Sequence, residues 1–166
     1  CTCLLELSKL QELELDGNQI TAVPDNAFLN LVELKILELN ENQISTVSQT
    51  SFKGLSKLLR LEISKNLLQE LPDNIFEDLL KLKILRLHTN HLKKLSTRTF
   101  GSKGAMQNIY SLFVGGNQLV EFESNFFRKF PSLTYVDFTN TPLTVLPNIS
   151  GIDTLKTFSI ANTKVS

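Results

Sequence analysis

One phrase recurs along the chain at a constant interval, and this period limits the possible folds more than any other feature of the sequence. Leu10, Leu34, Leu58 and Leu82 lie 24 residues apart, and each opens the pattern Leu-x-x-Leu-x-(Leu/Ile)-x-x-Asn. Repetition at this interval is typical of a solenoid, in which each repeat is one coil. We expect a single domain, because one repeat cannot bury its apolar side without neighbours.

The repeats cover nearly the whole chain. We place their starts at residues 10, 34, 58, 82, 109, 133 and 155, with residues 1–9 as a remnant cap or partial repeat. The fourth repeat carries three extra residues, for which we expect a convex bulge near Gly101, and Met106 then recovers the phase. The sixth is shorter than the others, with Ile149 and Ile152 replacing the usual Phe and Leu.

Each repeat begins with alternation of the kind found in a strand. Leu13 and Leu15 should face inward, while Glu12, Glu14 and Asp16 face outward. The rest of the repeat, of the form LPxxxFxxL, is too irregular for a long helix and should be extended or 3₁₀-like. We expect a right-handed, curved α/β-type solenoid with short parallel strands on its concave face. A column of rings should pack the convex side, formed by Phe28, Phe52, Phe76, Phe100 and Phe127.

One polar position recurs where each strand ends. A buried amide there can satisfy backbone groups of its own and the neighbouring coil, which would otherwise cost about 1–3 kcal/mol each. The residues of this predicted ladder are Asn18, Asn42, Asn66, Asn90, Asn117, Thr141 and Thr163.

The pattern resembles the leucine-rich-repeat family from Leu4 onward. Units of this length with LPxxxFxxL are typical of extracellular members such as Toll-like receptors and lamprey variable lymphocyte receptors. The resemblance implies an extracellular chain, secreted or part of a membrane protein's ectodomain. It also implies an N-terminal cap with a C-x-C core and two further cysteines.

Only Cys1 and Cys3 are present, so we expect a truncated cap or a short bridge between them. A metal site would need about four ligands, and we expect none. Asn148 opens the one N-glycosylation sequon. Because no signal sequence precedes Cys1, we expect a processed or excised chain.

The outward strand residues form the predicted binding face, because successive repeats place them side by side. Aromatic residues and arginine are common interface anchors, and apolar groups rimmed by charge mark interaction surfaces. The alternative is a charged, solvated face with a few stray apolar residues. The adjacent glutamates should repel one another, so either the arginines or a basic partner must neutralise them. The candidate ligand-binding residues are Glu14, Glu38, Arg60, Glu62, Arg86, His88, Phe113 and Tyr135.

Composition excludes several other functions. Lys plus Arg and Asp plus Glu both total 17, a balance unlike that of a nucleic-acid binder, and no apolar run is long enough to cross a bilayer. Ser64 and His88 could meet on neighbouring strands, but no oxyanion hole or phosphate loop accompanies them. We therefore expect neither catalysis nor a cofactor.

Two functional hypotheses remain. The first is an extracellular recognition module of innate-immune or receptor type, which binds a protein or a microbial surface glycan on its concave face. The second is a structural or adhesion module, like a matrix protein or synaptic organiser, that spaces and joins its partners. The sequence leaves the ligand and the oligomeric state open.

Overall fold

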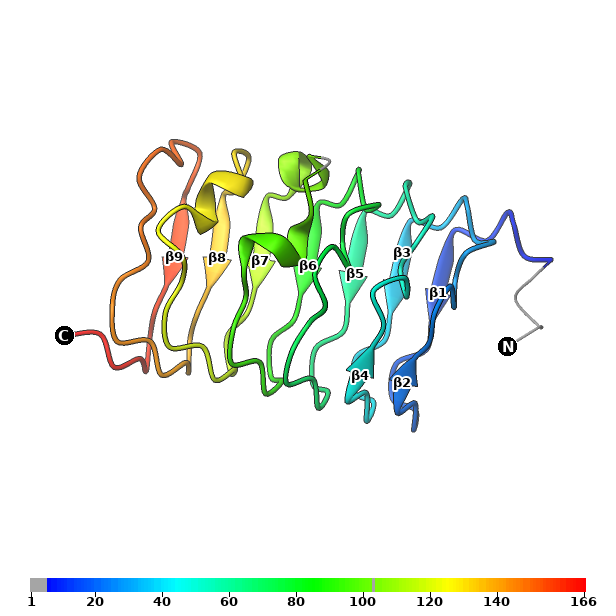
Figure 1. Ribbon diagram of the computed structural model, residues 1–166, viewed down its shortest axis with the longest axis horizontal. Coiled ribbons are helices and arrows are strands. Elements are labelled where there is room, and N and C mark those ends of the chain that lie inside the picture. The colour runs from blue at the N-terminus through cyan, green and yellow to red at the C-terminus, as the bar shows by residue number, and fades with distance from the viewer. Residues whose placement is uncertain (1–5, 103) are drawn as a thin grey trace.

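Seven short strands form one parallel sheet along the length of the molecule (Figure 1). The computed structural model describes residues 6–102 and 104–166. Each strand pairs with that of the next repeat, in the order β1-β3-β5-β6-β7-β8-β9. Their bounds are β1 (Glu12–Glu14), β3 (Ile36–Glu38), β5 (Arg60–Glu62), β6 (Ile84–Arg86), β7 (Ser111–Phe113), β8 (Tyr135–Asp137) and β9 (Thr157–Ser159).

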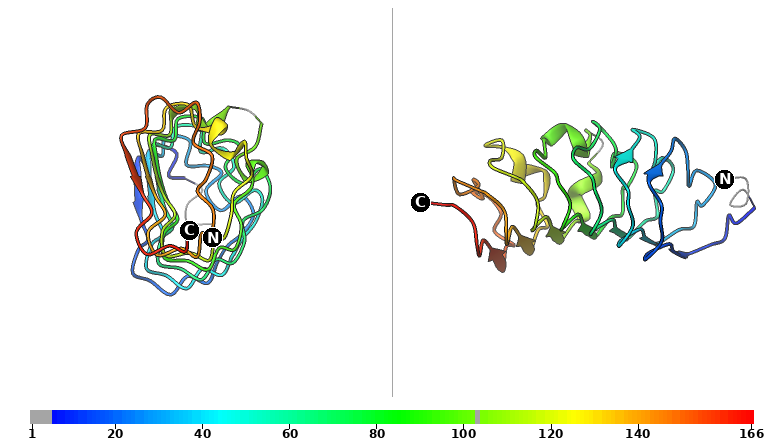
Figure 2. Two further views of the ribbon diagram at one scale, coloured as in Figure 1. Left: turned by 90° about the vertical axis from the view of Figure 1, so that its left-hand side faces the viewer. Right: turned by 90° about the horizontal axis from the view of Figure 1, so that it is seen from below.

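The coils stack into a tube with the sheet on one side. Seen along the tube in Figure 2, successive coils nearly superimpose. In the second view of that figure the strands line one long side, and this side is gently concave. The predicted solenoid with a concave strand face is therefore confirmed.

The return legs contain little regular structure. Two strands, β2 (Ala22–Val23) and β4 (Thr46–Val47), pair in parallel, and three turns of 3₁₀-helix follow in the fourth and fifth repeats. These turns are η2 (Thr97–Phe100), η3 (Ala105–Asn108) and η4 (Phe126–Lys129). The small sheet ends at the third repeat for a local reason. Ser48 N–H donates to the Val23 carbonyl, whereas Pro72 at the equivalent position has no N–H to donate.

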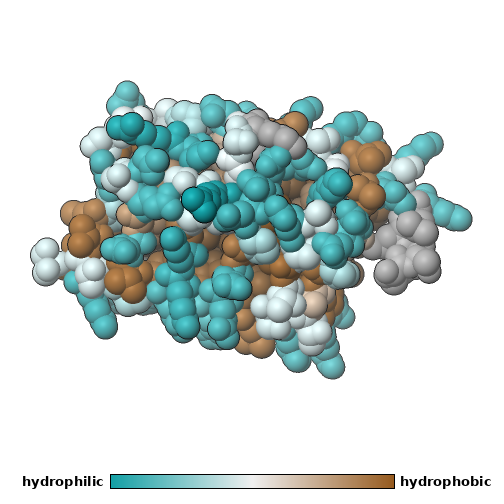
Figure 3. Space-filling model, viewed as in Figure 1, coloured by the Kyte–Doolittle hydropathy of each residue, from teal (hydrophilic) through white to brown (hydrophobic). Residues whose placement is uncertain are grey.

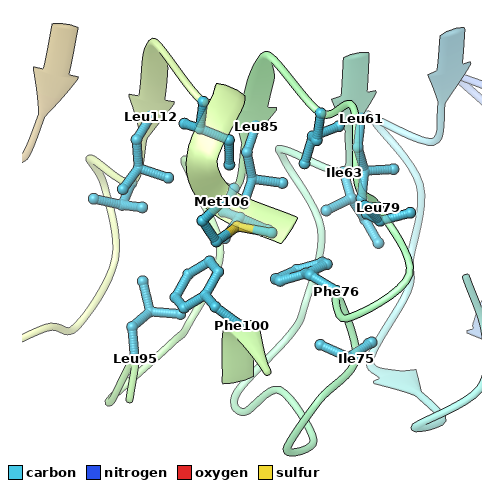
Figure 4. Close-up of a cluster of buried hydrophobic side chains, with 14 of the residues drawn as sticks. Leu61, Ile63, Ile75, Phe76, Leu79, Leu85, Leu95, Phe100, Met106 and Leu112 are labelled. Carbon is cyan, nitrogen blue, oxygen red and sulfur yellow. The ribbon is translucent and has the colours of Figure 1, made fainter. Parts of the chain in front are cut away.

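The core fills the tube between the sheet and the return legs. Leu61, Leu85 and Leu112 point inward from neighbouring strands towards Phe76 and Phe100 (Figure 4). Met106 of η3 is also buried, so the extra residues of the fourth repeat end with an anchor in the core. The turn η3 lies at the edge where the strands begin (Figure 1).

The phenylalanine column follows the prediction through four repeats and then departs from it. Successive centroids from Phe28 to Phe100 are 6.3, 6.1 and 5.6 Å apart. In the fifth repeat Phe100 contacts Phe126 at 5.6 Å and Phe130 at 5.0 Å, so the expected partner, Phe127, was wrong. The ring of Phe122 stands where earlier repeats have Val or Leu, and it packs on both Phe126 and Phe127.

The shortened sixth repeat also differs from the pattern. The position of Leu146 corresponds to Val23 in the first repeat. Val23 is buried, whereas Leu146 is 54% exposed. Pro147 is buried in its place, and Ile152 enters the core. We attribute the change to the missing residues, because a shorter return leg cannot follow the same path as its neighbours.

Candidate functional site

The strand face consists of the outward side chains of the seven strands, and its rows are set by the sheet register. One row joins Glu14, Glu38, Glu62, Arg86, Phe113, Asp137 and Ser159 as successive partners. The row beside it joins Glu12, Ile36, Arg60, Ile84, Ser111, Tyr135 and Thr157. Every candidate binding residue except His88 lies in one of these two rows.

Two arginines neutralise part of the glutamate row. Arg60 forms a salt bridge with Glu38, and Arg86 forms one with Glu62 at 2.8 Å. Both carboxylates are largely shielded from solvent, with side-chain exposures of 19% and 13%. Of the two explanations left open by the sequence, neutralisation within the chain therefore applies to Glu38 and Glu62. Glu14 is exposed and has no salt bridge among the described residues.

Arg86 also organises an aromatic cluster. Its guanidinium carbon lies 5.1 Å from the centroid of the Phe113 ring, within the range of a cation–π contact. The Phe113 ring is 4.8 Å from that of Tyr135, tilted by 36°, and 6.4 Å from that of His88. Arg86 and Phe113 are register partners on β6 and β7, Tyr135 lies diagonally from Phe113 on β8, and His88 follows β6 by two residues. We call them the aromatic cluster: Arg86, His88, Phe113 and Tyr135.

His88 is the half-buried member of this cluster. Burial lowers the pKa of its imidazole below the ordinary value of 6.5, and the charges of Arg86 and Lys65 act in the same direction. The charges of Glu62 and Asp137 oppose this effect. Its Nδ1 is buried without a hydrogen-bond partner, as are Oδ1 of Asn40 and Nε of Arg60. The neutral imidazole is therefore the favoured form near pH 7.

Among the described residues, no hydrogen bond joins Ser64 to His88. The Ser64 hydroxyl instead donates to a carboxylate oxygen of Glu62 at 3.2 Å. Within residues 6–102 and 104–166, no group of three or more His, Cys, Asp or Glu side chains is placed to hold a metal ion. The same part of the chain has no helix long and apolar enough to cross a membrane.

Two features beside the aromatic cluster were not anticipated from the sequence. A Cβ atom on Gly115 would lie 2.7 Å from the carbonyl oxygen of Thr139, so only glycine fits there. The chain therefore carries no side chain two residues after Phe113. Asp137 accepts the N–H of Thr139 at 2.8 Å, which fixes its carboxylate at the end of β8. Gly115 itself was the available signal in the sequence, because every other repeat has a side chain at this position.

The asparagine ladder supports the strand face from behind. Oδ1 of Asn66 accepts the N–H of Ile44 at 2.8 Å, and its amide group donates to the carbonyls of Leu39 and Ile63. Each buried amide thus bonds both to its own repeat and to the repeat before it. The same arrangement is found at Asn42, Asn90 and Asn117.

The ladder weakens at both ends. Among the described residues, Asn18 is exposed and donates only within its own repeat, to the carbonyls of Leu15 and Asp16. Thr141 is buried, and its one described hydrogen bond is donated to the Phe138 carbonyl. Thr163 is half-buried at the equivalent position of the last repeat.

Two sequence-predicted sites remain, the cysteine pair and the glycosylation sequon. Cys1 and Cys3 fall outside the described residues, and with them the predicted cap or bridge. Asn148 is exposed on the return leg of the sixth repeat, where its Oδ1 accepts the N–H of Ser150 at 3.0 Å. Its side chain is therefore accessible, and glycosylation there stays a prediction.

The stacked coils, the parallel sheet and the asparagine ladder define a repeat protein of the solenoid class. Residues 8–68 match a family model described as leucine rich repeat. A leucine-rich-repeat protein of Leptospira interrogans superposes with a TM-score of 0.81 at 26% identity, covering 93% of this chain and 38% of that one. TLR13, solved in complex with ssRNA13, gives 0.83 at 27% identity, covering 91% of this chain and 21% of that one. Residues 8–68 therefore match the leucine-rich-repeat family, and most of the chain shares the fold of a leucine-rich-repeat protein.

A third solved structure shares the fold alone. An internalin of Listeria monocytogenes gives a TM-score of 0.80 at 17% identity, with 98% of this chain and 44% of that one covered. The chain therefore spans less than half the length of each of these three proteins. Comparison with curated proteins gives no match.

Proposed function

We propose that the chain is a non-catalytic extracellular recognition module, of innate-immune or receptor type, that binds a protein or a microbial glycan on its strand face. The match of residues 8–68 to the leucine-rich-repeat family supports binding as the general activity. The aromatic cluster is the observation that favours the strand face. Its rings and guanidinium already contact one another, so they lose little conformational freedom when a ligand binds.

The surroundings of the cluster support this assignment. Arg86 is held between Glu62 and Phe113, so its position is fixed before binding. The cluster occupies the fourth to sixth of seven strands, where a concave face can surround a ligand. On the side opposite the sheet, seen in Figure 3, hydrophilic side chains cover much of the surface and apolar ones show only in separate patches.

A protein or neutral glycan fits the strand face better than a nucleic acid does. The TLR13 structure contains ssRNA13. On the strand face of this chain, however, Glu12, Glu14 and Asp16 are exposed and take part in no salt bridge among the described residues. Their charges would repel phosphates at this end of the sheet, and they would instead attract a partner with basic groups.

The first test is a binding screen of the immobilised chain against microbial cell-wall polymers and a panel of extracellular proteins. Each positive is then measured again with Phe113→Ala. The proposal expects at least one ligand whose affinity falls by about five-fold or more in this variant. If every ligand bound the variant as tightly as the parent chain, the strand face would not be the recognition surface.

A further inference from the structure

A second charged surface follows the edge at which the strands begin, and it lies outside the proposed concave site. We call it the strand-entry edge and define it as residues 9–11, 33–35, 57–59, 81–83, 108–110, 132–134 and 154–156. Although the whole chain has 17 basic and 17 acidic residues, the charged residues here are six lysines and one glutamate. They are Lys9, Glu33, Lys35, Lys57, Lys81, Lys83 and Lys156.

The backbone holds this edge in a regular line. The carbonyl of Lys35 accepts two N–H groups from the next repeat, those of Leu59 and Arg60, at 2.8 and 3.1 Å. The carbonyl of Lys83 accepts those of Tyr110 and Ser111 in the same way. Since neighbouring strands lie about 4.8 Å apart, the span from Lys9 to Lys81 is about 14 Å, three strand steps. The lysines of the first four repeats therefore stand at short intervals along this edge, and Lys156 follows three strand steps further on.

The positive charge of the edge is only slightly neutralised. Lys57 forms a salt bridge with Glu33 at 2.5 Å, and Lys35 donates to the side-chain amide oxygen of Gln11 at 3.0 Å. The hydrogen bond from Lys57, together with the charges of Lys57 and Lys35, lowers the pKa of Glu33. Among the described residues, no salt bridge involves the other lysines of the edge, and all six are exposed. This edge is the upper margin of the view in Figure 1. In the same view in Figure 3, hydrophilic side chains predominate along that margin.

We propose that the strand-entry edge binds a linear sulfated polysaccharide. A narrow line of exposed ammonium groups matches a chain that carries sulfates at short intervals better than it matches the broad surface of a membrane. The cations are all lysines, which act as point charges and do not offer the bidentate geometry of arginine. Single-stranded nucleic acid is bound by basic grooves in which aromatic rings stack on the bases. The edge has one aromatic residue, Tyr110, so the charges outnumber the stacking positions.

The fourth repeat supplies a matched pair of variants to test this proposal. Lys81 and Lys83 lie on the strand-entry edge, whereas Lys93 and Lys94 lie on the return leg of the same repeat, beyond the end of the strand. All four are exposed, and each double substitution to Gln removes two positive charges. Binding to heparin at about 0.1 M salt should weaken at least five-fold in Lys81→Gln/Lys83→Gln, with a flatter salt dependence. It should change less than two-fold in Lys93→Gln/Lys94→Gln, and equal losses in the two variants would refute a localised site.

A gain of affinity tests the same edge in the opposite direction. Glu33→Gln removes the one acidic residue of the strand-entry edge and frees Lys57. Heparin should therefore bind about two-fold more tightly. Unchanged or weaker binding would count against the proposal. Phe113→Ala should leave heparin affinity unchanged, because that side chain lies on the strand face. A loss there would instead assign heparin to the concave site.

The class of ligand is settled by comparing polyanions. The proposal expects desulfated heparin and a single-stranded RNA of similar charge to bind at least ten-fold more weakly than heparin. RNA binding as tight as heparin binding would exclude a sulfated polysaccharide as the specific ligand.

Discussion

The guanidinium of Arg86 lies 5.1 Å from the centre of the Phe113 ring, across the gap between β6 and β7. On its other side the same group donates to Glu62 of β5 at 2.8 Å. One arginine therefore connects an acidic strand to an aromatic one and neutralises a carboxylate that is shielded from solvent. The register of three consecutive strands makes this bridge possible, because it places Glu62, Arg86 and Phe113 in one row.

The first prediction concerns ligand binding at this bridge. Phe113→Ala or Arg86→Ala should weaken binding to the ligand found by the screen by at least about 1 kcal/mol, because each removes part of the preorganised cluster. Titration calorimetry measures the loss, and circular dichroism checks that the fold is retained.

A control for this experiment must lie on the convex side. Asn26 is unsuitable because its φ of 55° is in the left-handed region, where alanine would strain the backbone. Gln49 is exposed on the return leg of the second repeat, and Gln49→Ala should leave affinity unchanged. A loss in Gln49→Ala with none in Phe113→Ala would assign the ligand to the convex surface and favour a structural or adhesion role.

The second prediction compares a central and a terminal position of the ladder. Asn66→Ala should reduce the free energy of unfolding by about 1–3 kcal/mol, because the N–H of Ile44 and the carbonyl of Leu39 would be left buried without partners. Asn18→Ala should cost less than about 0.5 kcal/mol, because Asn18 is exposed and its hydrogen bonds to described residues stay within its own repeat. Urea denaturation of the two variants measures the difference, and equal losses would contradict a ladder directed towards the preceding repeat.

The third prediction uses the gap in the ladder at Thr141. In the second to fifth repeats, Oδ1 of the ladder asparagine accepts a backbone N–H from the repeat before it, always that of the eleventh residue. Asn117, for example, accepts the N–H of Leu92. The equivalent donor for position 141 is the N–H of Leu119. Thr141→Asn should supply that acceptor and raise the free energy of unfolding by about 0.5–1.5 kcal/mol. A drop in the urea midpoint would mean that the site has no room for the longer side chain.

The sequence predicted the coil, the strand register and the residues of both outward rows, because these depend on the period, which recurs in every repeat. It could not predict which neighbours in those rows would bond. The pairing of Arg86 with both Glu62 and Phe113 depends on side-chain conformations in three repeats. Phe127 was misplaced, and Leu146 departs from the repeat pattern, for a related reason. A bulky Phe122 and a shortened sixth repeat change the path of the return leg locally, which a periodic pattern does not show.

The fourth prediction concerns the dependence of stability on pH. The folded protein favours neutral His88, since burial lowers its pKa below 6.5, whereas the unfolded chain should titrate near that ordinary value. Between the two values the unfolded state binds more protons, so stability rises with pH in this window. The contribution of His88 should be fully present above about pH 7 and be lost as pH falls through 6.5 towards the folded pKa.

The chain offers a matched control, because its two histidines lie in the same repeat and only His88 belongs to the aromatic cluster. His91 is exposed at the turn that follows the strand. The urea midpoint of the parent chain should fall between pH 7.5 and pH 5, and His88→Gln should reduce that fall because it removes the buried titrating group. His91→Gln should retain the fall of the parent chain. If His91→Gln reduced the fall and His88→Gln did not, the burial of His88 would not be the source of the pH dependence.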